Sequence, residues 1–252
     1  MKFGVCVQPD RADEILSAGF DYIEIAAASL HGENSEFDLA PFRGLPILAS
    51  NLFFPGPMRL YGPDATPYLA YAKRTIERAA QIGIKVMVLG SGGARRSAEG
   101  IDAEARFVDI AAELNAVAAG YGIAVAPESL NHKETDVGNK MGRLAQDLRA
   151  HAVGFTADSY HLLVDWDAHF RKPGDSEPSA EFWEQEIPFT PVHVHFANLP
   201  RTVPTPDDVM VKGFVARLHS LSYDGNVSLE CTIEARPDAL REARQHLSQL
   251  FG

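Results

Sequence analysis

Short apolar segments alternate with helical patterns along the whole of this 252-residue chain, and this alternation limits the fold more than any other feature. We predict strands at residues 3–7, 22–26, 46–50, 85–89, 123–126, 153–158, 192–196 and 226–230. Helical patterns cover residues 10–18, 64–81, 102–119, 142–150 and 237–250. Such an α/β alternation is typical of one (β/α)8 TIM barrel, with an open doubly wound sheet as the alternative. Because no change of composition divides the chain, we expect residues 1–252 to form a single TIM-barrel domain.

Charge and cysteine content exclude several classes of partner. The formal net charge is −11, which argues against nucleic acid or an anionic membrane because phosphate binding is driven by Lys and Arg. Cys6 and Cys231 are isolated and form neither a disulfide framework nor a cysteine-rich metal site. The first residues lack the apolar segment of a signal peptide, and no stretch is long enough to span a bilayer. We therefore expect a cytoplasmic protein, and homo-oligomerisation stays open.

Each of the last four predicted strands ends in an ionisable side chain, and these are Glu128, Asp158, His195 and Glu230. One such residue alone is most simply explained as a strand end or a helix cap. Four on consecutive strands are harder to explain by coincidence. In a barrel the carboxyl ends of the strands converge on one mouth, where active sites of this fold lie.

Three carboxylates and one imidazole in a partly buried pocket would repel one another unless a cation lay between them. A divalent metal ion is therefore the expected cofactor. Oxygen-rich ligation with a single histidine suits Mn²⁺ or Mg²⁺, and then Co²⁺.

Several motifs in the second half of the chain resemble a known family. They are Glu128-Ser129-Leu130-Asn131-His132-Lys133-Glu134, Asp158-Ser159-Tyr160-His161, His195 with Arg201 six residues later, and Leu229-Glu230. The sequence is similar to the xylose-isomerase-like TIM-barrel family of sugar phosphate isomerases and epimerases, and within it to the ketose 3-epimerase branch related to D-tagatose 3-epimerase. The chain departs from the family in the long interval between Asp158 and His195.

The resemblance implies a role for each matching residue. Glu128, Asp158, His195 and Glu230 would bind one divalent metal ion, with Mn²⁺ favoured. The resemblance also implies that Glu134, His161 and Arg201 contact oxygens of a sugar substrate.

The chemistry implied by the resemblance is proton transfer next to a sugar carbonyl. The metal would stabilise a cis-enediolate, while Glu128 and Glu230 act as the two catalytic bases on its opposite faces. Return of the proton to the same carbon gives an epimer, whereas return to the adjacent carbon gives an aldose–ketose isomerase. The motif does not separate these two outcomes.

Three alternative functions stay open. The first keeps the metal but ends in elimination, as in the dehydratases or lyases of this family that act on inososes or keto-sugars. The second is a nuclease resembling apurinic endonucleases, which the missing histidines at the early strand ends and the acidic charge disfavour. The third is a non-catalytic sugar-binding subunit, which has no need for two proton-transfer carboxylates.

Other residues have two interpretations each. Glu24, at the end of an early strand, is a candidate substrate contact or a hydrogen-bond partner of a neighbouring strand. The glycine-rich segment 90–93, followed by Arg95 and Arg96, either approaches a substrate that an arginine could bind or forms a flexible loop with solvated arginines, since it does not complete a phosphate-binding motif. Phe53 and Phe54 cover a sugar, pack under their loop or form part of an oligomer contact. His193 and His195 share one face of a strand, and we expect His193 to lie behind the metal ligands.

Overall fold

The eight predicted strands are present and form one parallel sheet. The computed structural model describes residues 1–31, 37–234, 236 and 238–252. The strands are β1 (Lys2–Cys6), β2 (Tyr22–Ala26), β3 (Ile47–Asn51), β4 (Val86–Leu89), β5 (Ala124–Pro127), β6 (Thr156–Asp158), β7 (His193–Phe196) and β8 (Asn226–Leu229). Their order in the sheet is β5-β4-β3-β2-β1-β8-β7-β6.

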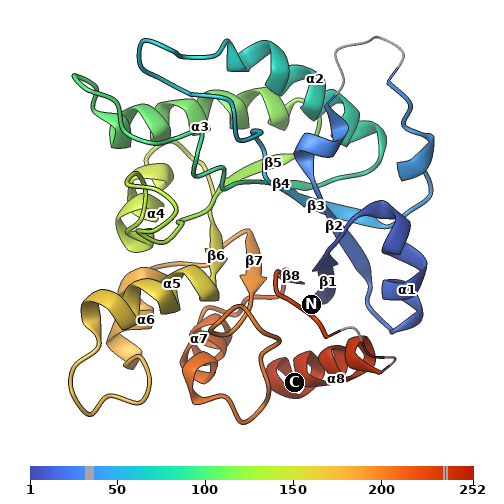
Figure 1. Cartoon of the computed structure of the whole chain (residues 1–252), viewed down its shortest axis with the longest axis vertical. Helices are drawn as coiled ribbons and strands as arrows, with labels where there is room; N and C mark the ends of the chain where they lie inside the picture. Colours follow the sequence, from blue (N-terminus) through green and yellow to red (C-terminus); the bar gives the residue numbers. More distant parts are fainter. Residues whose placement is uncertain (32–36, 235, 237) are drawn as a thin grey trace.

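One parallel bridge closes this sheet into a barrel. It joins Glu128, the residue after β5, to Thr156 at the start of β6, and so brings together the two edges of the sheet. Helices surround the strands on all sides (Figure 1). The structure is therefore a single (β/α)8 TIM barrel, as the sequence predicts, and the doubly wound alternative is wrong.

Helices and helical turns fill the connections between the strands. They are η1 (Pro9–Arg11), α1 (Ala12–Ser17), η2 (Ala27–Leu30), η3 (Ala40–Phe42), α2 (Tyr68–Gln81), α3 (Ala103–Ala119), α4 (Met141–Arg149), α5 (Ser159–Asp165), η4 (Trp166–Phe170), α6 (Ala180–Glu186), α7 (Val209–Ser220) and α8 (Ala239–Phe251). Residue 237, where we expect the last helix to begin, lies outside the described residues. No helix in the described part of the chain is long and apolar enough to cross a membrane.

The sequence patterns miss three helices between β6 and β8. Helices α5 and α6 have seven residues each, which is too short for a helical period to be recognised. Helix α7 contains Gly213 and three valines, all of which lower intrinsic helix propensity. Helix α2 also begins four residues later than expected, because Pro67 occupies its N-cap position.

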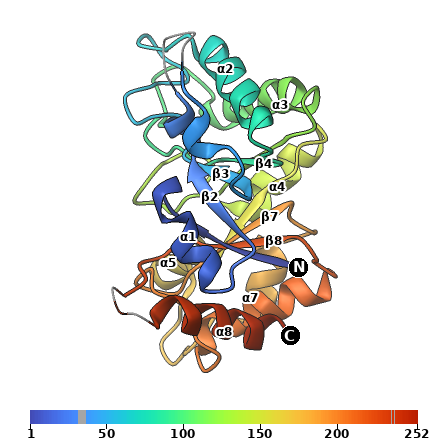
Figure 2. The same ribbon diagram turned by 90° about the vertical axis from the view of Figure 1, so that its right-hand side faces the viewer.

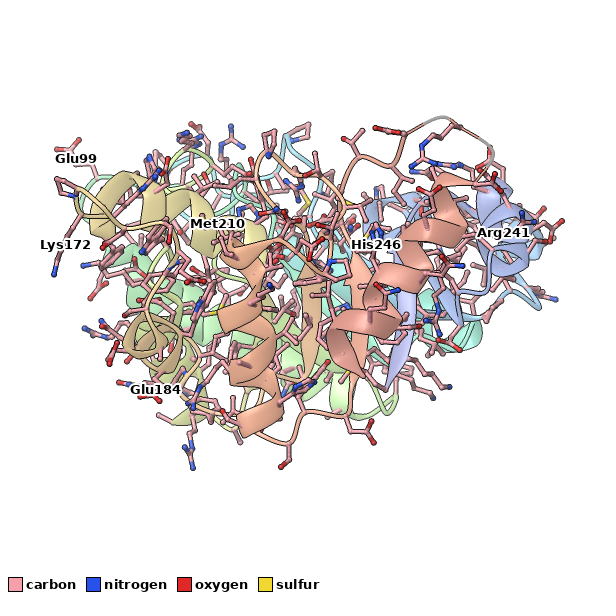
Figure 3. All side chains as sticks on the ribbon, turned by 90° about the horizontal axis from the view of Figure 1, so that it is seen from below. Glu99, Lys172, Glu184, Met210, Arg241 and His246 are labelled. Carbon is pink, nitrogen blue, oxygen red and sulfur yellow. The ribbon has the colours of Figure 1, made fainter. Side chains whose placement is uncertain are left out.

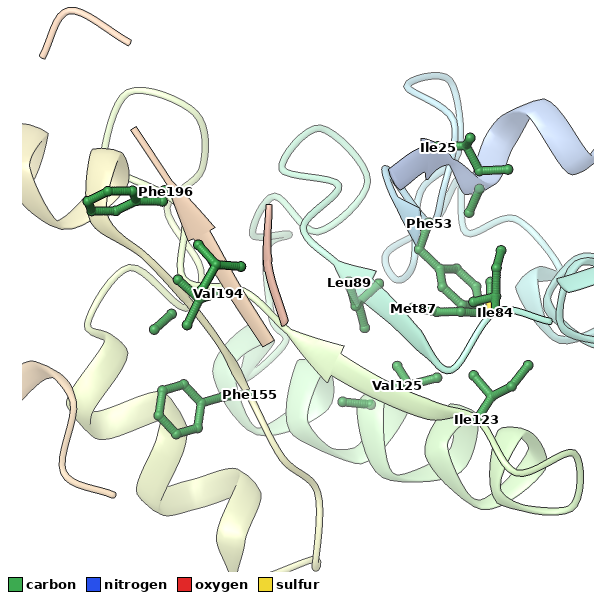
Figure 4. Close-up of a cluster of buried hydrophobic side chains, with 14 of the residues drawn as sticks. Ile25, Phe53, Ile84, Met87, Leu89, Ile123, Val125, Phe155, Val194 and Phe196 are labelled. Atoms are coloured by element: carbon green, nitrogen blue, oxygen red, sulfur yellow. The ribbon is translucent and has the colours of Figure 1, made fainter. Parts of the chain in front are cut away.

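Side chains alternate between the two faces of each strand and so separate two apolar layers. The outer layer packs the strands against the helices, and Figure 4 shows part of it, including Met87, Val125 and Val194. Tyr22 and Ala126 belong to a small inner cluster within the barrel. A Cβ on Gly4 would lie 2.3 Å from the Tyr22 ring, so the glycine leaves room for that ring.

The two ends of the chain pack together on one side of the barrel. The rings of Phe3 in β1 and Phe251 in α8 have centroids 5.8 Å apart, and the guanidinium of Arg244 lies 4.6 Å from the centroid of Phe3. Figures 1 and 2 both place the N-terminus beside α8. The last helix thereby covers the first strand of the barrel.

Candidate metal centre

The four candidate metal ligands meet at the carboxyl ends of β5 to β8. One ligand atom from each of Glu128, Asp158, His195 and Glu230 lies within 4.8 Å of the others. His195 Nδ1 is 2.7 Å from Glu128 Oε1, 3.4 Å from Glu230 Oε2 and 3.8 Å from Asp158 Oδ2. The structure thus brings together all four residues that the strand ends suggest.

The chemistry of this cluster fits a bound cation. Burial raises the pKa of Asp158 to about 7, and the Glu128 and Glu230 carboxylates add to that shift. Burial also disfavours the charged form of His195, yet Glu24, Glu230 and Glu128 raise the pKa of His195 well above its usual value. Three carboxyl groups around one buried nitrogen therefore favour a positive charge at their centre, which a divalent ion would supply with oxygen-rich ligation.

Glu24 holds His195 from behind the cluster. Glu24 is fully buried, and its Oε1 lies 2.8 Å from His195 Nε2. Its Oε2 lies 2.8 Å from His193 Nε2 and accepts a hydrogen bond of 2.6 Å from Ser228 Oγ. A carboxylate accepts only, so Nε2 of His195 carries the proton that donates to Glu24, and Nδ1 faces the three carboxylates. This arrangement is common for metal-ligating histidines.

This geometry decides between the two interpretations of Glu24 in favour of hydrogen bonds to neighbouring strands. His193 lies behind the candidate ligands, as we expect. The inward position of Glu24 on its strand was visible in the sequence, whereas its two imidazole partners on β7 were not.

Glu128 is fixed from two sides. A Cβ on Gly90 would lie 2.7 Å from Glu128 Oε2, so only glycine leaves space for the carboxylate there. Arg95 is fully buried, donates from Nη1 to the backbone oxygen of Glu128 over 2.8 Å, and lies over the ring of Phe107. Burial lowers the pKa of Arg95 to about 10. Arg95 thus supports the backbone of Glu128 and is not a solvated loop residue.

A cavity of about 660 Å³ opens above the cluster, and the three predicted substrate contacts line it. Arg201 donates from Nη2 to Glu230 Oε2 over 2.6 Å, and its Nη1 lies 3.9 Å from Glu134 Oε1. His161 Nδ1 lies 3.7 Å from the same oxygen of Glu134. Glu134, His161 and Arg201 therefore form one group beside the candidate metal ligands.

Three hydrogen bonds explain the spacing of these residues in the sequence. Asp158 Oδ1 accepts from the backbone N–H of His161 over 3.1 Å and caps helix α5, which places the histidine one turn beyond the strand end. Asn131 Nδ2 lies 2.7 Å from His161 Nδ1 and 3.3 Å from Glu134 Oε1. The loop after β5 is thereby joined to α5.

The structure decides between the interpretations of Phe53 and Phe54. Phe53 and Phe54 are buried and pack under their loop, so they do not cover the cavity. Leu52, which is 54% exposed, lines it instead. Asn51 donates to Glu230 Oε1 over 3.1 Å, a contact between distant segments that sequence patterns do not indicate.

Comparison with known proteins identifies the family. The model of the family described as xylose isomerase-like TIM barrel matches residues 12–250. The chain belongs to this family. The predicted family is thus confirmed, and the match supports an isomerase or epimerase enzyme. No curated protein matches the chain at a significant level.

Solved structures share the fold of this family member across its full length. A D-psicose 3-epimerase crystallised in the presence of D-fructose has a TM-score of 0.77 and 18% identity over 100% of both chains. The 3-keto-D-glucoside 4-epimerase YcjR from E. coli has a TM-score of 0.71 and 22% identity over 99% of this chain and 98% of that chain. The IolI protein with a bound zinc atom has a TM-score of 0.64 and 18% identity over 100% and 98%.

Proposed function

We propose that this protein is a divalent-metal-dependent sugar isomerase or epimerase that acts in the manner of a ketose 3-epimerase, with residues 1–252 working as one catalytic domain. The observation that carries the proposal is the cluster of Glu128, Asp158, His195 and Glu230 at the barrel mouth. We propose these four as the metal ligands, with Mn²⁺ as the preferred ion. Glu134, His161 and Arg201 line the same cavity and are the proposed substrate contacts.

When bound there, a divalent ion would polarise a sugar carbonyl and acidify the neighbouring C–H. Glu128 and Glu230 are the proposed bases. They follow β5 and β8, which are separated around the barrel by β6 and β7, so their carboxylates approach the cavity from different directions. One glutamate removes the proton from the sugar carbon, and the other delivers a proton to the opposite face.

His195 and, after it, Arg201 favour the ionised form of Glu230 in this proposal. Burial opposes ionisation, but His195 and Arg201 hold the pKa of Glu230 at about 2. Glu230 is therefore ionised at neutral pH and available as a ligand and proton acceptor.

Names of structural neighbours favour the same reaction class. D-psicose is a 2-ketose, so a 3-epimerase inverts the carbon next to the carbonyl. A 3-keto-D-glucoside 4-epimerase likewise inverts the carbon next to a ketone. A keto-sugar with a hydroxyl on the adjacent carbon is therefore the substrate class that we propose, and free ketoses are its first candidates.

A panel of ketoses and 3-keto-glucosides in deuterated water with added Mn²⁺ tests this function. NMR would locate the exchanged carbon, and mass spectrometry would detect loss of water. Deuterium at C3 of a ketose with unchanged composition is the expected result, whereas exchange at C1 indicates aldose–ketose isomerisation. Loss of water would replace the proposal with a dehydratase, and absence of exchange from every compound would contradict it.

Replacement of each proposed base provides the matched test. Glu128→Gln and Glu230→Gln remove the proton acceptor while keeping side-chain size, and both should abolish deuterium incorporation. Glu99 is exposed and does not line the cavity, so Glu99→Gln should exchange at the wild-type rate. Undiminished exchange in either of the first two variants would exclude that glutamate as a base.

A further inference from the structure

A second group of metal-ligating side chains lies outside the cavity described above. One ligand atom from each of His132, Asp165 and His169 lies within 4.8 Å of the others. The rings of His132 and His169 have centroids 4.5 Å apart. Sequence patterns place His132 on the loop after β5 and give His169 no role, so the proximity of these residues appears only in the structure.

Backbone geometry holds these three residues together. Asp165 Oδ1 accepts from the backbone N–H of His132 over 3.0 Å and also contacts its Nδ1. Asp165 ends α5, and His169 lies in η4, a π-helical turn in which Arg171 N–H donates to the oxygen of Trp166. Such turns are rare and frequently occur at functional sites. The turn carries His169 to the same side as Asp165 and His132.

The group faces a cavity of its own. This cavity has a volume of about 420 Å³, and His132, Asp165 and His169 line it together with Asn139, Lys140 and Glu186. Among the described residues, none that lines this cavity also lines the larger one at the barrel mouth. A ligand bound here would therefore occupy a separate space.

Two carboxyl groups and one lysine line this cavity beside the imidazoles, and the carboxyl groups favour a cation. Glu186 is buried, with its Oε2 accepting from the backbone N–H of Gly142 over 3.2 Å. Burial raises the pKa of Glu186 and the nearby Asp165 carboxylate adds to the shift, whereas backbone N–H groups of α4 and the Lys140 charge partly offset it. Two carboxyl groups thus interact across a cavity that also presents two imidazoles, and a divalent ion would offset their repulsion.

We propose that His132, Asp165 and His169 form a second divalent-metal site, of the kind that takes Zn²⁺. Two imidazoles and one carboxylate are a common ligand set for zinc with an open fourth position, whereas the centre at the barrel mouth is richer in oxygen. Zn–N and Zn–O bonds are about 2.0–2.2 Å long. Around an ion the three ligand atoms must therefore lie closer to one another than the 4.8 Å limit within which they lie here. Both histidines are exposed, so rotation of their rings can close the site around an ion, and its open position faces the cavity.

Equilibrium dialysis of the full chain against Zn²⁺, after removal of bound metal with a chelator, tests this site. The wild type should bind one ion more per chain than His169→Gln, and that ion should have a Kd of about 1 μM or tighter. His132→Gln should lose the same ion. His151 is exposed and lies on the turn after α4, so His151→Gln is the control and should match the wild type.

Asp158→Asn distinguishes this site from the centre at the barrel mouth. It removes a proposed ligand of that centre and should retain the ion that His169→Gln loses. Thermal unfolding of the metal-free variants would verify that each one folds. Equal Zn²⁺ stoichiometry and affinity in the wild type, folded His169→Gln and folded His132→Gln would overturn the second site, whatever the result for the sugar-exchange assay.

Discussion

Glu24 sets the orientation of two imidazoles although it is not one of the four proposed metal ligands at the barrel mouth. Its two carboxylate oxygens contact Nε2 of His193 and of His195, each at 2.8 Å. Despite full burial, these histidines lower the pKa of Glu24 well below its usual value. A fully buried charge is tolerated here because each oxygen has a donor.

Replacement of Glu24 should therefore weaken metal binding without removing a ligand. Glutamine keeps the shape but offers only one accepting oxygen, so one imidazole N–H loses its partner. We expect Glu24→Gln to bind Mn²⁺ about 10–100-fold more weakly, as measured by competition with a chelator. Glu14 is exposed and pairs with Arg11, so Glu14→Gln serves as the control. Wild-type affinity in folded Glu24→Gln would show that Glu24 does not position His195.

Gly90 tests how closely the carboxylate of Glu128 must be placed. An alanine Cβ would lie 2.7 Å from Glu128 Oε2, so the carboxylate would have to move. Displacement of a catalytic group by about 1 Å can lower the rate about 100-fold, and we expect a loss of that order in kcat for Gly90→Ala. Gly93 is in the same loop, with its nearest neighbour at 3.7 Å from an added Cβ. Gly93→Ala should keep the wild-type kcat, and equal rates in both variants would contradict this explanation.

Among the elements, α6 is held by glycines of two neighbouring helices. A Cβ on Gly142 in α4 would lie 2.1 Å from the backbone oxygen of Gln185 in α6. A Cβ on Gly213 in α7 would lie 2.2 Å from Nε1 of Trp183, which is buried in α6. These close contacts explain why a seven-residue helix in the long interval after β6 has a defined position.

Gly142→Ala should consequently destabilise the fold although alanine favours helices. The added Cβ meets backbone, which cannot rotate away, and overpacking of this kind costs about 1–3 kcal/mol. Urea denaturation would measure the free energy of unfolding. Gly120 ends α3, and an added Cβ there would be 3.5 Å from its nearest neighbour, so Gly120→Ala is the control. A Gly142→Ala variant as stable as the control would show that α4 and α6 pack less closely.

At the scale of the whole molecule, strand alternation is what made the barrel and its mouth predictable. Ala126 and Glu128 lie two residues apart, as do His193 and His195. Every second residue of a strand points to the same face, so a residue that faces the barrel interior predicts that the residue two positions later faces it too. The family resemblance predicted that Glu134, His161 and Arg201 contact the substrate. All three line one cavity in the structure.

What the sequence did not predict depends on contacts between distant segments. The pairing of Glu24 with β7 and the burial of Arg95 under the Glu128 backbone join residues from different strands and loops. Helices α5 and α6 are too short for periodicity and take their position from packing. The segment after η4 extends outward, with Lys172 at the edge of the molecule in Figure 3, and its sequence contains no regular pattern that would place it.

The centre at the barrel mouth can be tested by anomalous diffraction from crystals of the full chain grown with Mn²⁺, with data collected at the manganese absorption edge. We predict an anomalous peak bonded to carboxylate oxygens of Glu128, Asp158 and Glu230 and to Nδ1 of His195. Absence of a peak among these four side chains, at a Mn²⁺ concentration that saturates the protein in solution, would contradict the proposed metal centre and the chemistry that depends on it.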